Sequence, residues 1–408
     1  MGSYITGIII AMAMVFGLYA ALETAAGKSL FAQDKYDSTD PVKLRKIASA
    51  DVDLRGEDIK GQLDNRVEAI LQLGGRPGDL KETVPLLARL ANHHDIPVKN
   101  AAHASLNLIG QPAAPFMKSF FDRDTLDDYR AACSGIRAIG EPCKIYLPQI
   151  KKLLQSDVKI ERRCGLYALQ GLGKSGIDVL DEIIVCLDDE DFNNQCSACR
   201  ILETYGADAA PASEALLKLL ETGNPSTRGW AAVCLGGIGA KNAKDVDIAK
   251  VLASKLDARN PIEQQRVLTG LALLGPDAIG VLDAVKKKAE HRDGFVRSHA
   301  GYAIWRISKD DDVPFKLFEE MLANDQLAPD ALDLIGRMGN AGLPMLDSVV
   351  KKLSSTEAPV REEALIAIGR MGNGAARAKS QIEELLKDDD ALVRVAARRT
   401  LEKIASKE

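Results

Sequence analysis

Apolar residues recur along most of this chain at the spacing of helices, and small residues interrupt them at a regular interval. From about residue 64 onward, one small residue ends each apolar stretch, and we use these residues as anchors. They are Gly110, Gly140, Gly173, Gly206, Gly239, Gly275, Ser308, Gly339, Gly372 and Ala405. Six of the nine intervals between them are 33 residues. A period of this size indicates stacked supersecondary units.

Two columns of residues keep their chemistry relative to the anchors. All ten positions four residues before an anchor hold Leu or Ile, and nine of the ten positions eight residues before it hold Ala or Gly. A spacing of four places both columns on one face of a helix. The pattern predicts a first helix that buries large residues, approaches its neighbour through small ones, and ends at glycine. A second apolar helix follows each anchor, as in residues 147–157.

The repeat resembles a known class of helical proteins. The unit at residues 358–390 reads APVREEALIAIGRMGNGAARAKSQIEELLKDDD. Its Val-Arg-x-x-Ala-x-x-Ala-x-x-Ile-Gly style resembles HEAT-like repeats, of the kind also seen in phycobilisome lyases, and the resemblance covers roughly residues 64–408. It implies an all-α solenoid of about ten stacked two-helix repeats. Repeats of this type serve many roles, so the resemblance alone names no function.

The beginning of the chain has a different pattern. Residues 4–22 carry no charge, and nineteen such residues can just cross a membrane as an apolar helix. We predict an anchor or signal segment over 1–27, a polar tether over 28–63 and the repeat solenoid over 64–408. Asp40 and Pro41 predict the start of a short helix inside the tether.

The side of the membrane on which the repeats lie is left open by the charges around this segment. Lys28 and Lys35 follow it and no Lys or Arg precedes it, which by the positive-inside rule places the repeats in the cytoplasm. An uncleaved single-pass anchor is the favoured interpretation, because no small-x-small cleavage site follows Leu22. Export after cleavage of a signal peptide is the alternative.

A basic residue recurs eleven positions before many anchors. The residues in this ladder are Lys99, Arg162, Arg228, Arg297, Arg361 and Arg394. One interpretation makes them an anion-binding surface. The other pairs each with an acid at the junction between repeats, and we favour it because acidic runs such as 188–191 and 388–390 lie at those junctions. We expect these acids to be turn and N-cap residues.

Composition narrows the classes of partner. The chain is 46% hydrophobic, 27% charged and 5% aromatic, with a formal net charge of -5. A mildly acidic protein is a poor match to a phosphate backbone, so we predict no nucleic-acid partner.

Residues that could hold a metal or a cofactor lack the necessary patterns. None of the five histidines is followed by Glu, unlike the His-Glu pairs of the di-iron hydroxylases that resemble this fold, and His93, His94 and His103 lack zinc-ligand spacing. Cys196 and Cys199 form a lone CxxC inside a predicted helix, and we expect the seven cysteines to be free core thiols. We therefore predict no catalytic, cofactor or metal site and no enzymatic activity. A catalytic protein of the lyase or hydroxylase type is the alternative.

Aromatic residues on the face opposite the apolar columns are candidates for binding a protein partner. Trp305 lies three residues before its anchor, Tyr302 lies one turn earlier, and Tyr167 holds the equivalent place in another unit. Exposed Trp and Tyr are enriched at binding hot spots. The alternative is that Tyr302 and Trp305 pack against the irregular following unit, where Ser308 replaces the anchor glycine. Together these features predict a membrane-tethered scaffold that binds proteins of unknown identity.

Overall fold

The computed structural model describes residues 40–50, 59–240 and 246–405, and within these ranges the chain is helical without strands. The chain divides into two units, Met1–Tyr205 (unit 1) and Gly206–Glu408 (unit 2). Each unit is a stack of helical hairpins, which confirms the HEAT-like repeat architecture.

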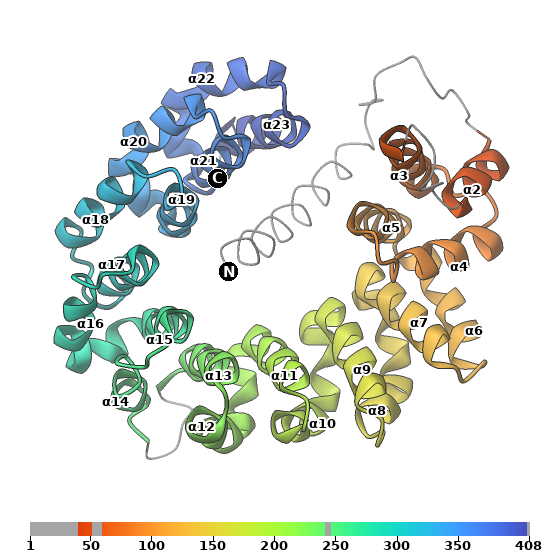
Figure 1. Cartoon of the computed structure of the whole chain (residues 1–408), viewed down its shortest axis with the longest axis horizontal. Helices are drawn as coiled ribbons and strands as arrows, with labels where there is room; N and C mark the ends of the chain where they lie inside the picture. The colour runs from red at the N-terminus through yellow and green to blue at the C-terminus, as the bar shows by residue number, and fades with distance from the viewer. Residues whose placement is uncertain (1–39, 51–58, 241–245, 406–408) are drawn as a thin grey trace. The chain divides into compact units, whose positions relative to one another are not determined.

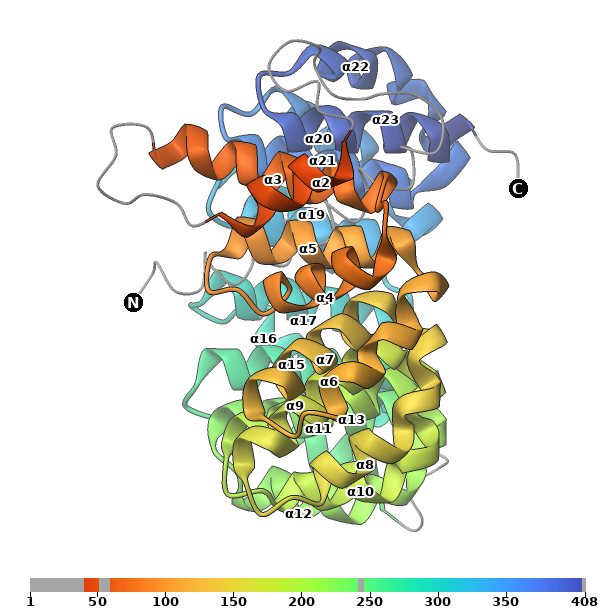
Figure 2. The same ribbon diagram turned by 90° about the vertical axis from the view of Figure 1, so that its right-hand side faces the viewer.

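Unit 1 consists of two rows of helices with the apolar core between them (Figures 1 and 2). The row of first helices comprises α3 (Ile59–Gly75), α5 (Ile96–Ile109), α7 (Leu126–Ile139), α9 (Lys159–Leu172) and α11 (Phe192–Tyr205). The row of second helices comprises α4 (Leu80–Leu90), α6 (Lys118–Phe121), α8 (Leu147–Leu154) and α10 (Leu180–Val185). Successive first helices pack directly on one another, from α3 to α11.

Unit 2 repeats the arrangement. Its first helices are α13 (Pro225–Ile238), α15 (Pro261–Leu274), α17 (Gly294–Ser308), α19 (Ala328–Arg337), α21 (Ala358–Arg370) and α23 (Ala391–Ala405). Its second helices are α12 (Ser213–Thr222), α14 (Ile248–Ala253), α16 (Leu282–Lys288), α18 (Asp312–Leu322), α20 (Leu346–Lys351) and α22 (Lys379–Glu384). Short 3-10 turns, such as Gly173–Val179 in unit 1 and Gly339–Met345 in unit 2, join many first helices to second ones.

The anchor glycines end the first helices, as their pattern predicts. Gly140 has φ 81° and ψ -141°, and Gly110 has φ 63° and ψ -135°. This part of backbone space is open essentially to glycine alone. The backbone N–H of each glycine donates to the carbonyl four residues earlier, which closes the last turn before the chain reverses into the next helix.

The two sequence columns form the core. Leu106 and Ile136 of the large column and Ala102 and Ala132 of the small column are fully buried. Mid-helix glycines extend the close approach between neighbours: a Cβ atom on Gly236 of α13 would lie 2.2 Å from the carbonyl oxygen of Gly270 on α15. The small residues therefore determine how near the first helices lie.

The short helix expected within residues 28–63 is present. The helix α2 (Pro41–Ser49) lies within the stretch assigned to the tether, and it packs on α3 with Leu44 and Ala48 buried. The side chain of Asp40 accepts a hydrogen bond from the N–H of Val42, so the expected N-cap is present. The predicted apolar helix at 4–22 lies outside the described residues and stays a prediction.

The repeat around Ser308 departs from the others in its helix end. The helix α17 continues through Ser308 and is capped by Lys309, which has φ 60° and ψ 19°. A lysine in this left-handed conformation is unusual, because its Cβ crowds the backbone. The hydroxyl of Ser308 donates to the carbonyl of Ile304 within the last turn. The anchor column thus moves by one residue in this repeat.

Candidate binding surface

The predicted contact residues Tyr302 and Trp305 lie together on α17, but neither is exposed. Each retains 9% of its accessible surface, and the two ring centroids are 5.8 Å apart. The ammonium nitrogen of Lys309 lies 4.3 Å from the centroid of the Trp305 ring, because the left-handed cap turns Lys309 back over the helix. The premise that these aromatic side chains are exposed is wrong, and both belong to the packed core of unit 2.

Tyr167 on α9 has a different environment. Its ring is half-buried, and the guanidinium carbon of Arg137 on α7 lies 4.3 Å from the ring centroid. The ammonium nitrogen of Lys99 on α5 lies 5.6 Å from the same centroid. Both cations interact with the π-system of one ring. Three successive first helices therefore place an aromatic side chain and two positive charges at one point of the unit 1 surface.

Two further residues extend this group, which we name the Tyr167 cluster: Lys99, His103, Arg137, Tyr167 and Arg200. The imidazole of His103 lies edge-on to the Tyr167 ring at a centroid distance of 6.4 Å, and its Nε2 is 3.1 Å from the carbonyl oxygen of Ala91. This oxygen can only accept, so Nε2 carries the hydrogen. Burial and the charges of Arg137 and Lys99 lower the pKa of His103 to about 3, so the imidazole is neutral at pH 7.

Arg200 of α11 completes the cluster. Burial lowers the pKa of its guanidinium, and the positive charge of Arg137 lowers it further. The exposed carboxylate of Glu203 acts in the opposite direction without reversing the shift. Of the five residues in the cluster, the sequence pointed to Tyr167 as a protein-binding candidate and to Lys99 as a member of the basic ladder, but not to His103, Arg137 or Arg200. Arg200 holds the same place, six residues before its anchor, as Tyr167 does in the preceding repeat, and this shared column was the available signal.

The corresponding face of unit 2 pairs its charges internally. A carboxylate oxygen of Asp333 on α19 lies 2.8 Å from the guanidinium of Arg337, and the other lies 2.6 Å from that of Arg370 on α21. Although burial opposes ionisation of Asp333, these two arginines hold its pKa below the ordinary value. Burial, with the charge of Asp333, raises the pKa of nearby Glu363 to about 7.

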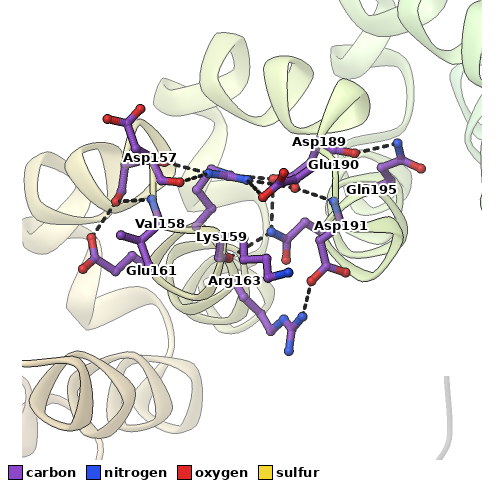
Figure 3. A network of polar contacts seen from close by, with 12 residues as sticks. Asp157, Val158, Lys159, Glu161, Arg163, Asp189, Glu190, Asp191 and Gln195 are labelled. Atoms are coloured by element: carbon purple, nitrogen blue, oxygen red, sulfur yellow. Dashed lines mark hydrogen bonds and ion pairs between the residues drawn. The ribbon is translucent and has the colours of Figure 1, made fainter.

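The arginine ladder is largely occupied by contacts between repeats. The guanidinium of Arg162 donates to both carboxylate oxygens of Asp189 at 2.6 and 3.1 Å, and the Asp189 side chain is 1% exposed. Although burial opposes its ionisation, the hydrogen bond from Arg162 helps to lower the pKa of Asp189. Figure 3 shows the surrounding network, in which Arg163 contacts Asp191 and the Gln195 amide donates to the Asp189 carbonyl at 2.8 Å.

The same pairing recurs in unit 2. Arg228 donates to Glu263 at 2.6 and 2.7 Å, and Arg361 donates to Asp388 at 2.8 and 2.7 Å. Arg297 and Arg394 instead donate to backbone carbonyls at the end of the preceding repeat. The interpretation that acids pair with this column is confirmed at Arg162, Arg228 and Arg361, and Lys99 is the member that faces the Tyr167 ring instead.

The acidic runs are turn and cap residues, as expected. The side chain of Asp388 accepts from the N–H of Asp390, which in turn accepts from the N–H of Leu392 at the start of α23. Asp310 accepts in the same way from the N–H of Asp312 at the start of α18. These bonds satisfy N–H groups that the helix itself leaves open.

The seven cysteines all lie in the described ranges and none forms a disulfide bond; all except the half-buried Cys196 are buried. Burial raises the pKa of Cys143 to about 12 and that of Cys133 well above its ordinary value. Cys199 lies inside α11, so the CxxC pair is placed mid-helix. Within the described residues, no group of three or more His, Cys, Asp or Glu side chains is arranged to hold a metal ion.

One described segment, Pro261–Lys288, has the length and hydropathy of a membrane span. It includes α15, α16 and the 3-10 turn between them, and half of its apolar window is buried inside unit 2. The repeat core accounts for its apolar character. The candidate span at residues 4–22 lies outside the described part of the chain.

Comparisons with known proteins give structural likenesses at low identity. No protein-family model matches the chain, and no curated protein matches it. An engineered protein of known structure shares 20% identity over 90% of this chain and 100% of that chain, with a TM-score of 0.41. The CpcE–CpcF complex of phycocyanin lyase from Nostoc sp. PCC7120 shares 21% identity over 63% of this chain and 94% of that chain, with a TM-score of 0.45.

The karyopherin Kap121p, bound to the extreme C-terminus of the protein phosphatase Cdc14p, shares 14% identity. That match covers 97% of this chain and 54% of the karyopherin, with a TM-score of 0.42. At these identities and TM-scores, the binding and catalytic roles of these proteins do not transfer to this chain.

Proposed function

We propose that this chain is a protein-binding scaffold and that the Tyr167 cluster of unit 1 contacts the partner. The observation that supports the proposal is the half-buried Tyr167 ring between the cations of Lys99 and Arg137. Neither cation forms an ion pair with a carboxylate among residues 40–50, 59–240 and 246–405. Their charges are therefore available to a second molecule.

The arrangement suits a binding hot spot for two physical reasons. Tyr and Arg are enriched at hot spots because they combine a large contact area with directional polar groups. The side chains of Lys99 and Arg137 already lie against the Tyr167 ring, and all three are half-buried, so little of their conformational entropy is left to lose on binding.

Affinity purification of the full chain from its native cells tests this function. Cross-linked partners would be compared between the wild type, Tyr167→Ala and Trp305→Ala by mass spectrometry. The proposal expects a specific partner that Tyr167→Ala loses and that Trp305→Ala retains at equal levels of folded protein. Recovery of the same proteins with wild type and Tyr167→Ala would contradict it.

Binding is the proposed function in preference to catalysis because the Tyr167 cluster offers charge and aromatic surface. Its titratable imidazole, His103, is engaged with the Ala91 carbonyl. Metal analysis of the purified full chain separates the two classes. Stoichiometric iron or zinc would favour the lyase or hydroxylase alternative.

We also propose, on the sequence alone, that residues 4–22 tether the scaffold to a membrane. The support is the uncharged run of nineteen residues. Carbonate extraction of membranes, with mass spectrometry of the N-terminus, tests the tether. An intact N-terminus in the membrane pellet agrees with it, whereas a soluble chain cut after the apolar run would make this an exported protein.

A further inference from the structure

We propose that the Tyr167 cluster recognises an acidic segment of a protein partner, with side-chain carboxylates accepting hydrogen bonds from Lys99 and Arg137. This inference rests on the proposed function and specifies the chemistry of the partner. It follows from the charge balance, the span and the ring geometry of the cluster.

The positive charges of the cluster act on one another across neighbouring helices. Lys99, Arg137 and Arg200 belong to three different first helices, yet the effects of their charges overlap. Arg137 disfavours the charged form of Arg200, and Arg137 and Lys99 together disfavour a charged His103. Lys99 and Arg137 both lie against the Tyr167 ring, and neither forms an ion pair with a carboxylate of the described ranges. A carboxylate brought between these two cations would relieve repulsion that the folded chain holds in place.

The span of the cluster favours an extended chain over a single small anion. Lys99, Arg137 and Tyr167 come from α5, α7 and α9, which pack in succession as first helices. Neighbouring packed helices lie about 8–10 Å apart, so the row from α5 to α9 covers roughly 18 Å. An extended peptide rises about 3.3 Å per residue, and about five or six residues would match this row.

The ring geometry disfavours nucleic acid as the source of the negative charge. Single-stranded nucleic acids bind proteins by stacking bases on aromatic rings beside a basic groove. Here the Arg137 guanidinium lies 4.3 Å from the Tyr167 ring centroid, so it occupies a position that a stacked base would need. The net charge of -5 for the whole chain also opposes a long polyanion.

The test measures binding of a defined peptide to the full chain in neutral detergent. Fluorescein-labelled hexaglutamate is titrated at low salt and followed by anisotropy, with labelled hexaglutamine as the uncharged control. The proposal expects binding of the glutamate peptide alone, weakened at high salt because exposed charges are screened. Inorganic phosphate and oligothymidylate are added as competitors, and displacement by either at concentrations below those of unlabelled hexaglutamate would overturn the choice of an acidic peptide.

Matched variants locate the binding. Lys99→Gln combined with Arg137→Gln should weaken hexaglutamate binding about tenfold or more, because two charge-assisted hydrogen bonds are lost. Lys152→Gln is the control, since Lys152 is an exposed lysine on the second helix α8. It should change binding less than twofold, and circular dichroism should show equal helicity for all variants. An equal loss in the control and the double variant would contradict the proposal.

The two experiments distinguish a loss of the scaffold function from a loss of the acidic partner. If hexaglutamate does not bind, but Tyr167→Ala loses a native partner, the scaffold function stands and the acidic chemistry is wrong. If Tyr167→Ala loses no partner and hexaglutamate does not bind, both are wrong. Binding of hexaglutamate that depends on Lys99 and Arg137 supports the acidic segment independently of the purification.

Discussion

The same face of the first helices is built differently in the two units. In unit 1, Lys99 and Arg137 lie against the half-buried ring of Tyr167, and neither forms an ion pair with a carboxylate of the described ranges. In unit 2, Asp333 joins Arg337 and Arg370 in ion pairs, and the aromatic pair lies in the core. The repeat framework is shared, so the difference lies in the positions that the framework leaves free.

The comparison distinguishes residues that hold the repeats together from residues that determine the charge of the surface. The columns four and eight residues before the anchors are buried in both units except at the half-buried Leu401, and junction arginines pair with acids in both. The column six residues before the anchor instead holds Tyr167 and Arg200 in one unit and Tyr302 and Asp333 in the other. A repeat of this kind can change its surface charge without changing its core.

Truncating an aromatic side chain in each unit should give the largest difference in stability between the two units. Trp305→Ala should lower the free energy of unfolding of unit 2 by about 3–5 kcal/mol, because it removes a buried ring from the core. Tyr167→Ala should cost about 1 kcal/mol, because its ring is half-buried and its cations become solvated. Chemical denaturation measured by circular dichroism compares the two. Equal losses would remove the distinction between a core aromatic and a surface aromatic.

The stability lost on removing an arginine of the ladder should depend on whether its partner is a carboxylate or a backbone carbonyl. Arg228→Ala should cost about 3 kcal/mol, because the carboxylate of Glu263, whose side chain is 1% exposed, would be left unpaired. Arg297→Ala should cost about 1 kcal/mol, because it loses hydrogen bonds to backbone carbonyls at the edge of the repeat. Both lie in unit 2, so urea denaturation of each variant against wild type gives a matched pair. A larger loss for Arg297→Ala would reverse the assignment.

A fall in pH should change the stability of the chain in opposite directions through His103 of unit 1 and Glu363 of unit 2. The pKa of His103 is about 3 in the folded chain and about 6.5 unfolded, so the unfolded state binds more protons between these values. Stability should therefore fall as pH drops from 6.5 to 4.5, by about 1 kcal/mol per pH unit relative to His103→Gln. Denaturation of wild type and His103→Gln at several pH values measures this difference, and parallel curves would contradict it.

Glu363 supplies the opposite sign in unit 2. Its pKa is raised from 4.5 to about 7 on folding, so the folded state binds the extra proton in this window. The wild type should lose stability relative to Glu363→Gln as pH rises from 4.5 to 7. Denaturation of the wild type and Glu363→Gln at several pH values measures this loss. If the wild type instead lost stability relative to Glu363→Gln as pH fell, Glu363 would be ionised in the folded chain.

The tyrosine hydroxyls should give the smallest effect. The hydroxyl of Tyr167 is buried without a hydrogen-bond partner in the described part of the chain, so Tyr167→Phe should be neutral or stabilising by up to about 1 kcal/mol. The hydroxyl of Tyr302 accepts a hydrogen bond from Arg306 at 3.4 Å, and Tyr302→Phe should cost less than about 1 kcal/mol. Thermal melts of the two variants compare them, and a destabilised Tyr167→Phe would indicate a partner for that hydroxyl.

Helix periodicity allowed most of the fold to be predicted from the sequence. The anchor glycines and the Leu, Ile and Ala columns report on contacts within one helix and with its immediate neighbours, which repeat every 33 residues. The junction acids were readable for the same reason, since Asp189 and Asp388 follow the preceding helix at a constant distance. The local geometry is the same in each repeat, so a local sequence pattern was sufficient to predict it.

Burial of Tyr302 and Trp305, and the convergence of the Tyr167 cluster, depended on tertiary structure. Trp305 is 9% exposed, and the ammonium of Lys309 lies 4.3 Å from its ring centroid beside a left-handed helix end that a lysine does not predict. Lys99, Arg137 and Arg200 are far apart in sequence and occupy three different columns. Their side chains approach one another only because α5, α7, α9 and α11 stack at a separation set by small residues. Charge and exposure at this face are properties of the stack, which no single repeat contains.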